Sequence, residues 1–276
     1  MTKAEEKLHA EALALVDLDR DLTAEEREFV LDNFQEISTA ANSTHGAFFT
    51  PGELANDLAI EILTGAHRIL DLGAGIGRLS HACQGRVTTG PHEGQQRHFT
   101  CIESNPDYLR VGRRVMPDAE WILGDILDVP SMGLDRFDMA IANPPFGAVA
   151  RSKNAPGYNG ARFEYHVIAV ASMMADDGVF IVPQRSSGFE FSGKSEYRNI
   201  DSPEYRQFRT ATGLTLEPAC SIDTSLYRTA WHGVTPVTEV VFVDFTERAK
   251  HAETRRPTPR GLPRPARHQY MLDVGA

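Results

Sequence analysis

The pattern of apolar and polar positions divides most of the chain into alternating strands and helices. Apolar runs of about four to eight residues, bounded by glycine, proline or acidic residues, predict buried strands. Longer segments with apolar residues every three or four positions predict helices. Strands that alternate with helices favour right-handed crossovers and a mostly parallel sheet. We predict strands at 68–73, 98–104, 119–125, 137–145, 178–183, 216–223 and 237–245, and helices at 78–84, 107–115, 163–175 and 202–212.

Two further helices are predicted ahead of the first strand, over residues 2–18 and 23–38. In the second of them Thr23 and Glu26 fit a capping box, in which each side chain accepts from the other residue's backbone amide. These helices read as an extension of residues 1–45 that precedes the alternating segment of residues 46–247.

The segment "FFTPGEL" predicts another helix just before the first strand. Thr50 fits the N-cap position, Pro51 fits the first helical position, and Gly65 fits the C-terminal end. We therefore expect a helix that runs from Pro51 to about Gly65.

The charge of the chain is acidic overall but uneven. Its net charge is −10 and its pI is near 5.5, which is the wrong sign for a nucleic-acid binder as a whole, because phosphate contacts dominate such binding. Residues 255–268, within a tail of residues 248–276, carry five arginines and no acidic residue. This Pro/Arg-rich strip fits either a local phosphate contact or a solvated tail.

Neither a membrane segment nor a metal site is predicted. No stretch of eighteen apolar residues occurs, and the acidic N-terminal segment lacks the apolar core of a signal peptide. Cys83, Cys101 and Cys220 lie far apart, which argues against a disulfide framework and against a thiolate zinc site. We expect a cytoplasmic protein.

A glycine turn, "DLGAGIG", follows the first predicted strand at residues 71–77. Glycines at the carboxyl end of a strand let the backbone approach a ligand closely. The spacing is G-x-G-x-G instead of G-x-G-x-x-G, and Asp71 would repel a pyrophosphate. The turn therefore favours a ligand with a cationic end, such as an ammonium group, unless it is a purely structural turn.

Acidic residues also end the next two predicted strands. Glu103 is placed to accept ribose hydroxyls, as in other nucleotide-binding α/β folds. Asp125 is placed to accept from an adenine amino group, with Ile126 beside it. A single acidic residue at a strand end is more often a helix cap, but three of them at one edge of a sheet favour a binding site.

The fourth predicted strand runs into "NPPF", residues 143–146. A planar amino group is a poor nucleophile until its lone pair leaves conjugation, and two acceptors aimed at its N–H bonds favour that change. The Asn143 side-chain oxygen and the Pro144 carbonyl can supply them. Pro144 and Pro145 fix the backbone, and Phe146 can stack on the target ring. The motif indicates catalysis on a planar amine or amide.

These motifs together resemble the class I S-adenosylmethionine-dependent amino methyltransferases, over about residues 46–245. Asp71, Gly73, Gly75, Glu103, Asp125, Ile126 and Asn143 match that family's cofactor-binding positions, and "GAFFTP" (46–51) resembles the γ-class N6-adenine DNA methyltransferases. The resemblance implies a Rossmann-like α/β fold with a seven-stranded sheet, S-adenosylmethionine as cofactor, and a methionine end held by Phe49, Thr50 and Pro51. Asn143, Pro144, Pro145 and Phe146 would then be catalytic.

Two polar loops follow the predicted site, at 147–166 and 183–199. Their position and the charges of Arg151, Lys153 and Arg162 predict phosphate contacts in a substrate-gating segment. Two histidines nearby, His45 and His166, read as loop or helix-surface residues without a chemical role.

The resemblance implies methylation of adenine N6 in DNA, with short or weak sequence specificity because the tail is too short for a large recognition domain. Two alternatives stay open at this point. The motif also resembles RNA adenine methyltransferases, and it resembles protein glutamine N5-methyltransferases, which the acidic net charge favours. The sequence does not determine the oligomeric state.

Overall fold

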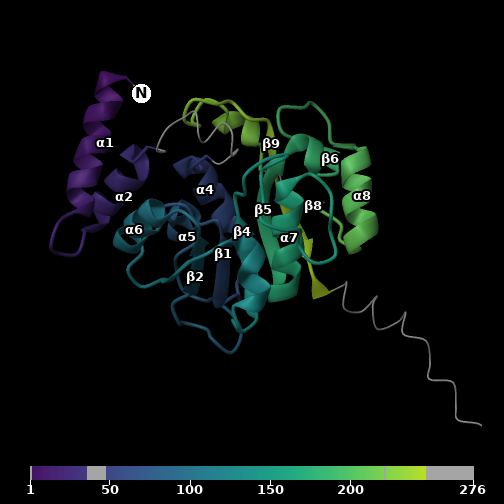
Figure 1. Cartoon of the computed structure of the whole chain (residues 1–276), viewed down its shortest axis with the longest axis horizontal. Helices are drawn as coiled ribbons and strands as arrows, with labels where there is room; N and C mark the ends of the chain where they lie inside the picture. Colours follow the sequence, from purple (N-terminus) through teal and green to yellow (C-terminus); the bar gives the residue numbers. More distant parts are fainter. Residues whose placement is uncertain (1, 36–47, 221, 247–276) are drawn as a thin grey trace, which may run out of the picture.

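A seven-stranded sheet lies at the centre of the computed structural model, which describes residues 2–35, 48–220 and 222–246 (Figure 1). The strand order is β3-β2-β1-β4-β5-β9-β8, and two short strands, β6 and β7, form a separate pair. The strands are β1 (Arg68–Leu72), β2 (His98–Glu103), β3 (Glu120–Leu123), β4 (Phe137–Ala142), β5 (Ala175–Pro183), β6 (Phe189–Glu190), β7 (Arg198–Asn199), β8 (Glu217–Pro218) and β9 (Thr238–Asp244).

The first five strands of the sheet pair in parallel, and β9 and β8 are added in antiparallel orientation. This arrangement confirms the predicted mostly parallel, seven-stranded sheet. The strand order reverses at β1, which has β2 on one side and β4 on the other. In an open α/β sheet such a reversal leaves a crevice at the carboxyl ends of the two central strands.

Both faces of the sheet are buried, and alternate strand residues serve opposite faces. Ile69 and Ile141 belong to one apolar cluster, whereas Leu70 and Ala142 belong to the other. The first cluster lies under α4, α5 and α6, and the second lies under α7.

The helices are α1 (Lys3–Val16), α2 (Ala24–Asn33), α4 (Gly52–Leu58), α5 (Arg78–Ala82), α6 (Pro106–Val115), α7 (Phe163–Met174) and α8 (Pro203–Thr212), with 3-10 turns η1 (Ala59–Glu61), η2 (Ile126–Ser131), η3 (Gln184–Ser186) and η4 (Thr224–Tyr227).

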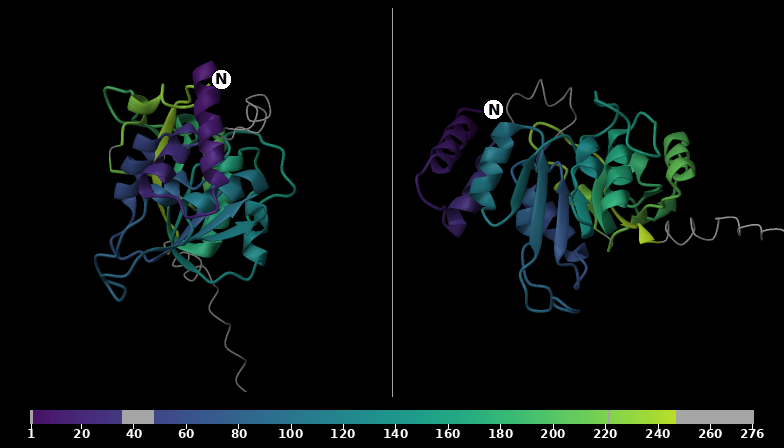
Figure 2. Two further views of the ribbon diagram at one scale, coloured as in Figure 1. Left: turned by 90° about the vertical axis from the view of Figure 1, so that its left-hand side faces the viewer. Right: turned by 60° about the horizontal axis from the view of Figure 1, so that its bottom comes forward.

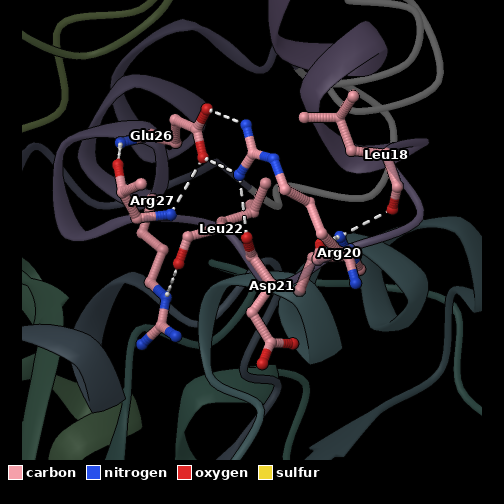
Figure 3. A network of polar contacts seen from close by, with 8 residues as sticks. Leu18, Arg20, Asp21, Leu22, Glu26 and Arg27 are labelled. Atoms are coloured by element: carbon pink, nitrogen blue, oxygen red, sulfur yellow. Dashed lines mark hydrogen bonds and ion pairs between the residues drawn. The ribbon is translucent and has the colours of Figure 1, made fainter.

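The two N-terminal helices pack beside α6 at the edge of the molecule (Figure 2). Helix α2 begins with the predicted capping box of Thr23 and Glu26, and α1 begins with a second capping box, of Thr2 and Glu5, that the sequence analysis missed. A polar network ties the connection between them to the rest of the fold (Figure 3): Arg20 pairs with Glu26 at 2.6 Å, and Arg114 of α6 donates to the Leu18 carbonyl at 2.9 Å. Residues of both helices belong to the same apolar cluster as the adjoining sheet face.

Several predicted boundaries differ from the structure. Helix α2 ends at Asn33, and residues 36–38 of its predicted range lie outside the described residues. Strand β8 is confined to Glu217–Pro218, much shorter than the predicted 216–223, although the Ala219 amide still donates to the Val240 carbonyl of β9.

The predicted helix start at Thr50 is wrong. Helix α4 begins at Gly52, its N-cap is Pro51, and no side chain caps it. The Thr50 hydroxyl instead accepts a hydrogen bond from Asn143, 93 positions away. The helix also ends earlier than predicted, with Leu58 followed by a 3-10 turn to Glu61, so Gly65 does not close it.

No helix among the described residues is long and apolar enough to cross a membrane. The predicted basic tail and His45 lie outside the described residues.

Candidate active site

A cavity of about 580 Å³ opens at the carboxyl ends of the central strands. Its walls come from the segment before α4, the glycine turn, the ends of β2, β3 and β4, and the first residue of α7. Nine of the predicted site residues line it: Phe49, Gly73, Gly75, Glu103, Asp125, Ile126, Asn143, Pro145 and Arg151. The sequence analysis missed eight further lining residues: Phe48, Ser104, Asn105, Tyr108, Val149, Ala150, Ser152 and Phe163.

The glycine turn approaches the Phe49 ring closely, and its backbone conformation favours glycine. Gly75 has φ +57°, and a Cβ built on it would lie 3.2 Å from the Phe49 ring. The ring also packs edge-on against Tyr108, with centroids 5.0 Å apart. Glycine at this position therefore lets Phe49 close over the turn, which brings the segment before α4 onto the cofactor side of the sheet.

Asp71, near the end of β1, is a buried carboxylate with one unused oxygen. Ser80 donates to its Oδ2 at 2.7 Å, whereas Oδ1 is buried without a hydrogen-bond partner. Burial raises the pKa of Asp71 to about 7, against the lowering effect of the Ser80 hydrogen bond. An unpaired buried acceptor is costly, and Asp71 lines a small hollow that also includes Asn143. A cationic donor would fit Oδ1.

Glu103, at the end of β2, braces the glycine turn. Its Oε2 accepts from the Gly75 amide at 2.8 Å, and its Oε1 accepts from the Asn105 amide at 2.7 Å. Burial raises the pKa of Glu103, and these backbone hydrogen bonds lower it. The Ser104 hydroxyl also donates to Oε1, at 3.5 Å, whereas Oε2 keeps a second lone pair, so Glu103 can still accept from a ligand in the cavity.

Asp125 caps a helical turn and faces the cavity at the same time. Its Oδ1 accepts from the Leu127 amide at 2.9 Å, at the start of η2, and its Oδ2 accepts from the Ser152 hydroxyl at 2.7 Å. The capping and binding interpretations of this residue are therefore compatible.

Asn143, just after β4, is held with its side-chain oxygen unused. Its Nδ2 donates to the Phe48 carbonyl at 2.9 Å and to the Thr50 hydroxyl at 3.0 Å. Since both amide hydrogens are taken by acceptors, the orientation of the amide is fixed. Its Oδ1 is buried and has no partner. The site thus presents a free acceptor that fits an incoming N–H donor.

The other predicted residues lie around this cavity without lining it. Thr50 lines the small hollow beside Asp71, and Pro51 lines a neighbouring cavity between α2 and α4. Pro144 is buried, and Phe146 is half-buried against the apolar cluster.

The basic residues that were predicted to contact the substrate make ion pairs or hydrogen bonds within the protein. Lys153 pairs with Asp128 at 2.5 Å, and Arg162 lies 3.8 Å from Glu204. Arg151 donates to the Gly160 carbonyl at 3.0 Å. Ion pairs at the surface contribute little to stability, so these residues could exchange their present partners for phosphates. Phosphate contacts by the three residues stay a prediction.

The prediction that His166 is a surface residue is wrong. The ring is fully buried in α7, its Nδ1 accepts from the Ala155 amide at 3.0 Å, and its Nε2 contacts the Gly160 carbonyl at 2.9 Å. A carbonyl only accepts, so Nε2 carries the hydrogen and the ring is neutral; burial also lowers the pKa of His166. His166 therefore fastens residues 155–160 to α7.

Some of the missed residues had a sequence signal. Ser104 and Asn105 directly follow Glu103, and Asn105 before Pro106 is typical of a helix cap. Phe48 adjoins Phe49, but its role comes from its carbonyl, which no side-chain pattern reveals. Phe163 reaches the cavity only through the packing of α7.

The sheet order, the glycine turn and the acceptors at the strand ends define a class I S-adenosylmethionine-dependent methyltransferase fold. Within this class the chain belongs to the N-6 DNA methylase family, whose sequence model matches residues 18–184. S-adenosylmethionine is the cofactor of this class, and the unpaired Asp71 Oδ1 fits its ammonium group.

Solved structures share this fold at low sequence identity. A type I restriction-modification methyltransferase subunit from Streptococcus thermophilus is 15% identical, with a TM-score of 0.54 over 80% of this chain and 48% of that chain. A modification subunit assigned to a type I restriction enzyme of Vibrio vulnificus is 12% identical, with a TM-score of 0.51 over 82% of this chain and 51% of that chain.

A protein from Listeria monocytogenes assigned to the class I S-adenosylmethionine-dependent methyltransferases is 12% identical, with a TM-score of 0.54 over 88% of this chain and 75% of that chain. The present chain thus spans about half the length of the two restriction-system subunits. No curated protein matches its sequence.

Proposed function

We propose that the protein transfers a methyl group from S-adenosylmethionine to the N6 amino group of adenine in DNA, with short or weak sequence specificity. The observation that carries this proposal is the fixed Asn143 amide, whose Oδ1 is buried and unpaired at the end of β4. Membership of the N-6 DNA methylase family supports DNA as the substrate.

In this proposal, residues of the cavity and of the small hollow beside it would hold the parts of the cofactor. Asp71 would bind the ammonium group through Oδ1, and Glu103 would accept from the ribose hydroxyls. Asp125 and Ile126 would hold the adenine ring, and Phe49 would cover the methionine end. When bound there, the cofactor supplies an electrophilic methyl group on a positively charged sulfur.

The residues of the chain prepare the amino group that accepts the methyl. Asn143 Oδ1 and the Pro144 carbonyl accept hydrogen bonds from the two N–H groups of this amino group. These hydrogen bonds turn the nitrogen lone pair out of conjugation with the ring. Asn143 Oδ1 is held before substrate arrives, so it stabilises the charge that develops on nitrogen without reorganisation. Phe146 stacks on the target base, which must leave a duplex to reach this site.

The same two acceptors would fit adenine N6 in RNA or the side-chain amide of a glutamine. No contact among the described residues favours either one over DNA, so the identity of the methylated product distinguishes the three substrates.

Replacement of Asn143 tests the proposal. Asn143→Ala removes the fixed acceptor, and we expect methyl transfer to a random-sequence DNA duplex to fall by on the order of 10²-fold or more. Cofactor affinity, measured by calorimetry, should change little. Asn33→Ala is the control, because this amide donates to the Phe29 carbonyl within α2. A near-normal rate in Asn143→Ala would overturn the catalytic role.

A further inference from the structure

The chain leaves the Asn-Pro-Pro-Phe motif through Gly147, whose two backbone groups are both bound by the first turn of α7. The Phe163 amide donates to the Gly147 carbonyl at 2.7 Å, and the Gly147 amide donates to Glu164 Oε2 at 2.8 Å. Gly147 has φ +82°, a conformation that disfavours other residues. No side chain caps α7, so the Gly147 carbonyl satisfies one of the free amides at its start.

The other oxygen of Glu164 reaches a different loop. Ser186, in the turn after β5, donates to Glu164 Oε1 at 2.7 Å, and the Ser186 carbonyl accepts from the Tyr165 hydroxyl at 2.9 Å. The side chain of Glu164 is fully buried. A buried carboxylate is expensive unless hydrogen bonds satisfy it, and here each oxygen has a donor.

We propose that Glu164 is a positioning residue for methyl transfer, which joins the exit of the catalytic motif to the loop after β5. This inference rests on the proposed function. Glu164 does not contact the amino group; it acts through Gly147, which fixes where Phe146 and the Pro144 carbonyl lie. The same carboxylate also accepts from Ser186. It therefore joins the two loops on the substrate side into one unit that faces the target base.

Three variants separate this role from general support of the fold. Glu164→Ala removes both bonds and should lower kcat by on the order of 10²-fold, the cost of a displacement of about 1 Å in a reacting group. Glu164→Gln keeps an acceptor for the Gly147 amide, and the Ser186 hydroxyl can reverse its role and accept. We therefore expect Glu164→Gln to retain kcat within about threefold.

Asp138→Ala is the matched control. Asp138 lies on β4 at the opposite end of the strand from the motif, and its Oδ2 accepts from the His67 and Arg68 amides at 2.7 and 2.8 Å. Its loss should destabilise the protein in a similar way without lowering kcat.

The measurements are kcat and KM on duplex DNA, cofactor affinity by calorimetry, and hydrogen exchange of the Gly147 amide. We expect Glu164→Ala to lose kcat and Gly147 protection with unchanged cofactor affinity. Equal kcat in Glu164→Ala and Asp138→Ala, or a loss in Glu164→Gln as large as in Glu164→Ala, would overturn the positioning role. If the wild-type protein itself methylates none of the substrates tested, the proposed function fails instead, and the exchange data still decide whether Glu164 holds Gly147.

Discussion

Thr50 illustrates how one hydroxyl can set the chemistry of another residue. Local sequence rules assign it to the start of a helix, because it precedes a proline and an acidic residue. In the structure its Oγ1 lies 3.0 Å from Asn143 Nδ2. Together with the Phe48 carbonyl it occupies both hydrogens of the Asn143 amide, so the acceptor oxygen has one orientation only.

Thr50→Val tests this effect at the residue scale. Valine keeps the shape of the side chain but removes the acceptor, which leaves one Asn143 hydrogen unsatisfied and lets the amide rotate. We expect kcat to fall by about tenfold, since an unsatisfied buried donor costs roughly 1–3 kcal/mol. Thr50→Ser should retain most of the activity. Steady-state kinetics on DNA provide the measurement, and equal rates in the two variants would contradict the orienting role.

If Asp71 binds the ammonium group as proposed, cofactor binding should depend on pH. Burial raises its pKa from 3.8 to about 7, so its charged form, which attracts an ammonium group, becomes populated only as the pH rises toward 7. Below that value each unit of pH should weaken cofactor binding by up to about tenfold. Titration calorimetry between pH 5 and pH 7 measures this. Asp71→Asn should bind weakly at every pH, and a wild-type affinity that is flat over this range would contradict the assignment.

At the scale of elements, helix α2 packs against residues that line the cavity. Phe34, at the end of α2, packs against Phe49 and Tyr108, with ring centroids 6.2 and 6.3 Å away. Arg78, the first residue of α5 after the glycine turn, pairs with Asp32 of α2 at 2.6 Å. Helix α2 therefore supports both the Phe49 ring beside the cavity and the helix that follows the glycine turn.

Phe34→Leu should weaken cofactor binding although Phe34 does not line the cavity. Leucine preserves most of the apolar volume but removes the ring that backs Phe49, so we expect a severalfold rise in the cofactor Kd. Val16→Ala, a buried substitution in α1, should lower the melting temperature and leave the Kd unchanged. If both variants bind the cofactor equally well, α2 does not support the site.

The sequence predicted the elements better than their ends and contacts. Strong apolar periodicity located β1, β2, β4, β5 and α7, and the reversal of strand order then placed Asp71 and Asn143 at one edge. The β6–β7 pair was missed because strands of two residues leave no periodic signal. His166 and Thr50 were misread because their partners lie elsewhere in the chain or beneath a helix, and local rules cannot include such partners.

At the scale of the whole molecule, the proposed function requires an acidic protein to bind an acidic polymer. The net charge of −10 disfavours nucleic acid as a general ligand, so binding would depend on local cations near the cavity. Lys153 and Arg162 are such cations. If either contacts DNA, it replaces a weak ion pair at the protein surface with a contact to a phosphate.

Charge reversal at Lys153 and Arg162 tests that contact. We expect the double variant Lys153→Glu, Arg162→Glu to weaken DNA binding and to flatten its dependence on salt, because fewer counterions are released. Cofactor affinity should not change. The double variant Lys3→Glu, Lys7→Glu, on the remote helix α1, changes the total charge by the same amount and is the control. Unchanged DNA affinity in the double variant would remove these residues from the substrate surface.

The most direct test of the central claim is methyl transfer from labelled S-adenosylmethionine to four pools in parallel: duplex DNA, single-stranded DNA, total RNA and a protein extract. Each labelled product is digested and identified. The account predicts N6-methyldeoxyadenosine from DNA, and its loss in the Asn143→Ala variant. Label found only in RNA or in protein would contradict the assignment to DNA, and binding of the cofactor without label in any pool would contradict the proposed activity.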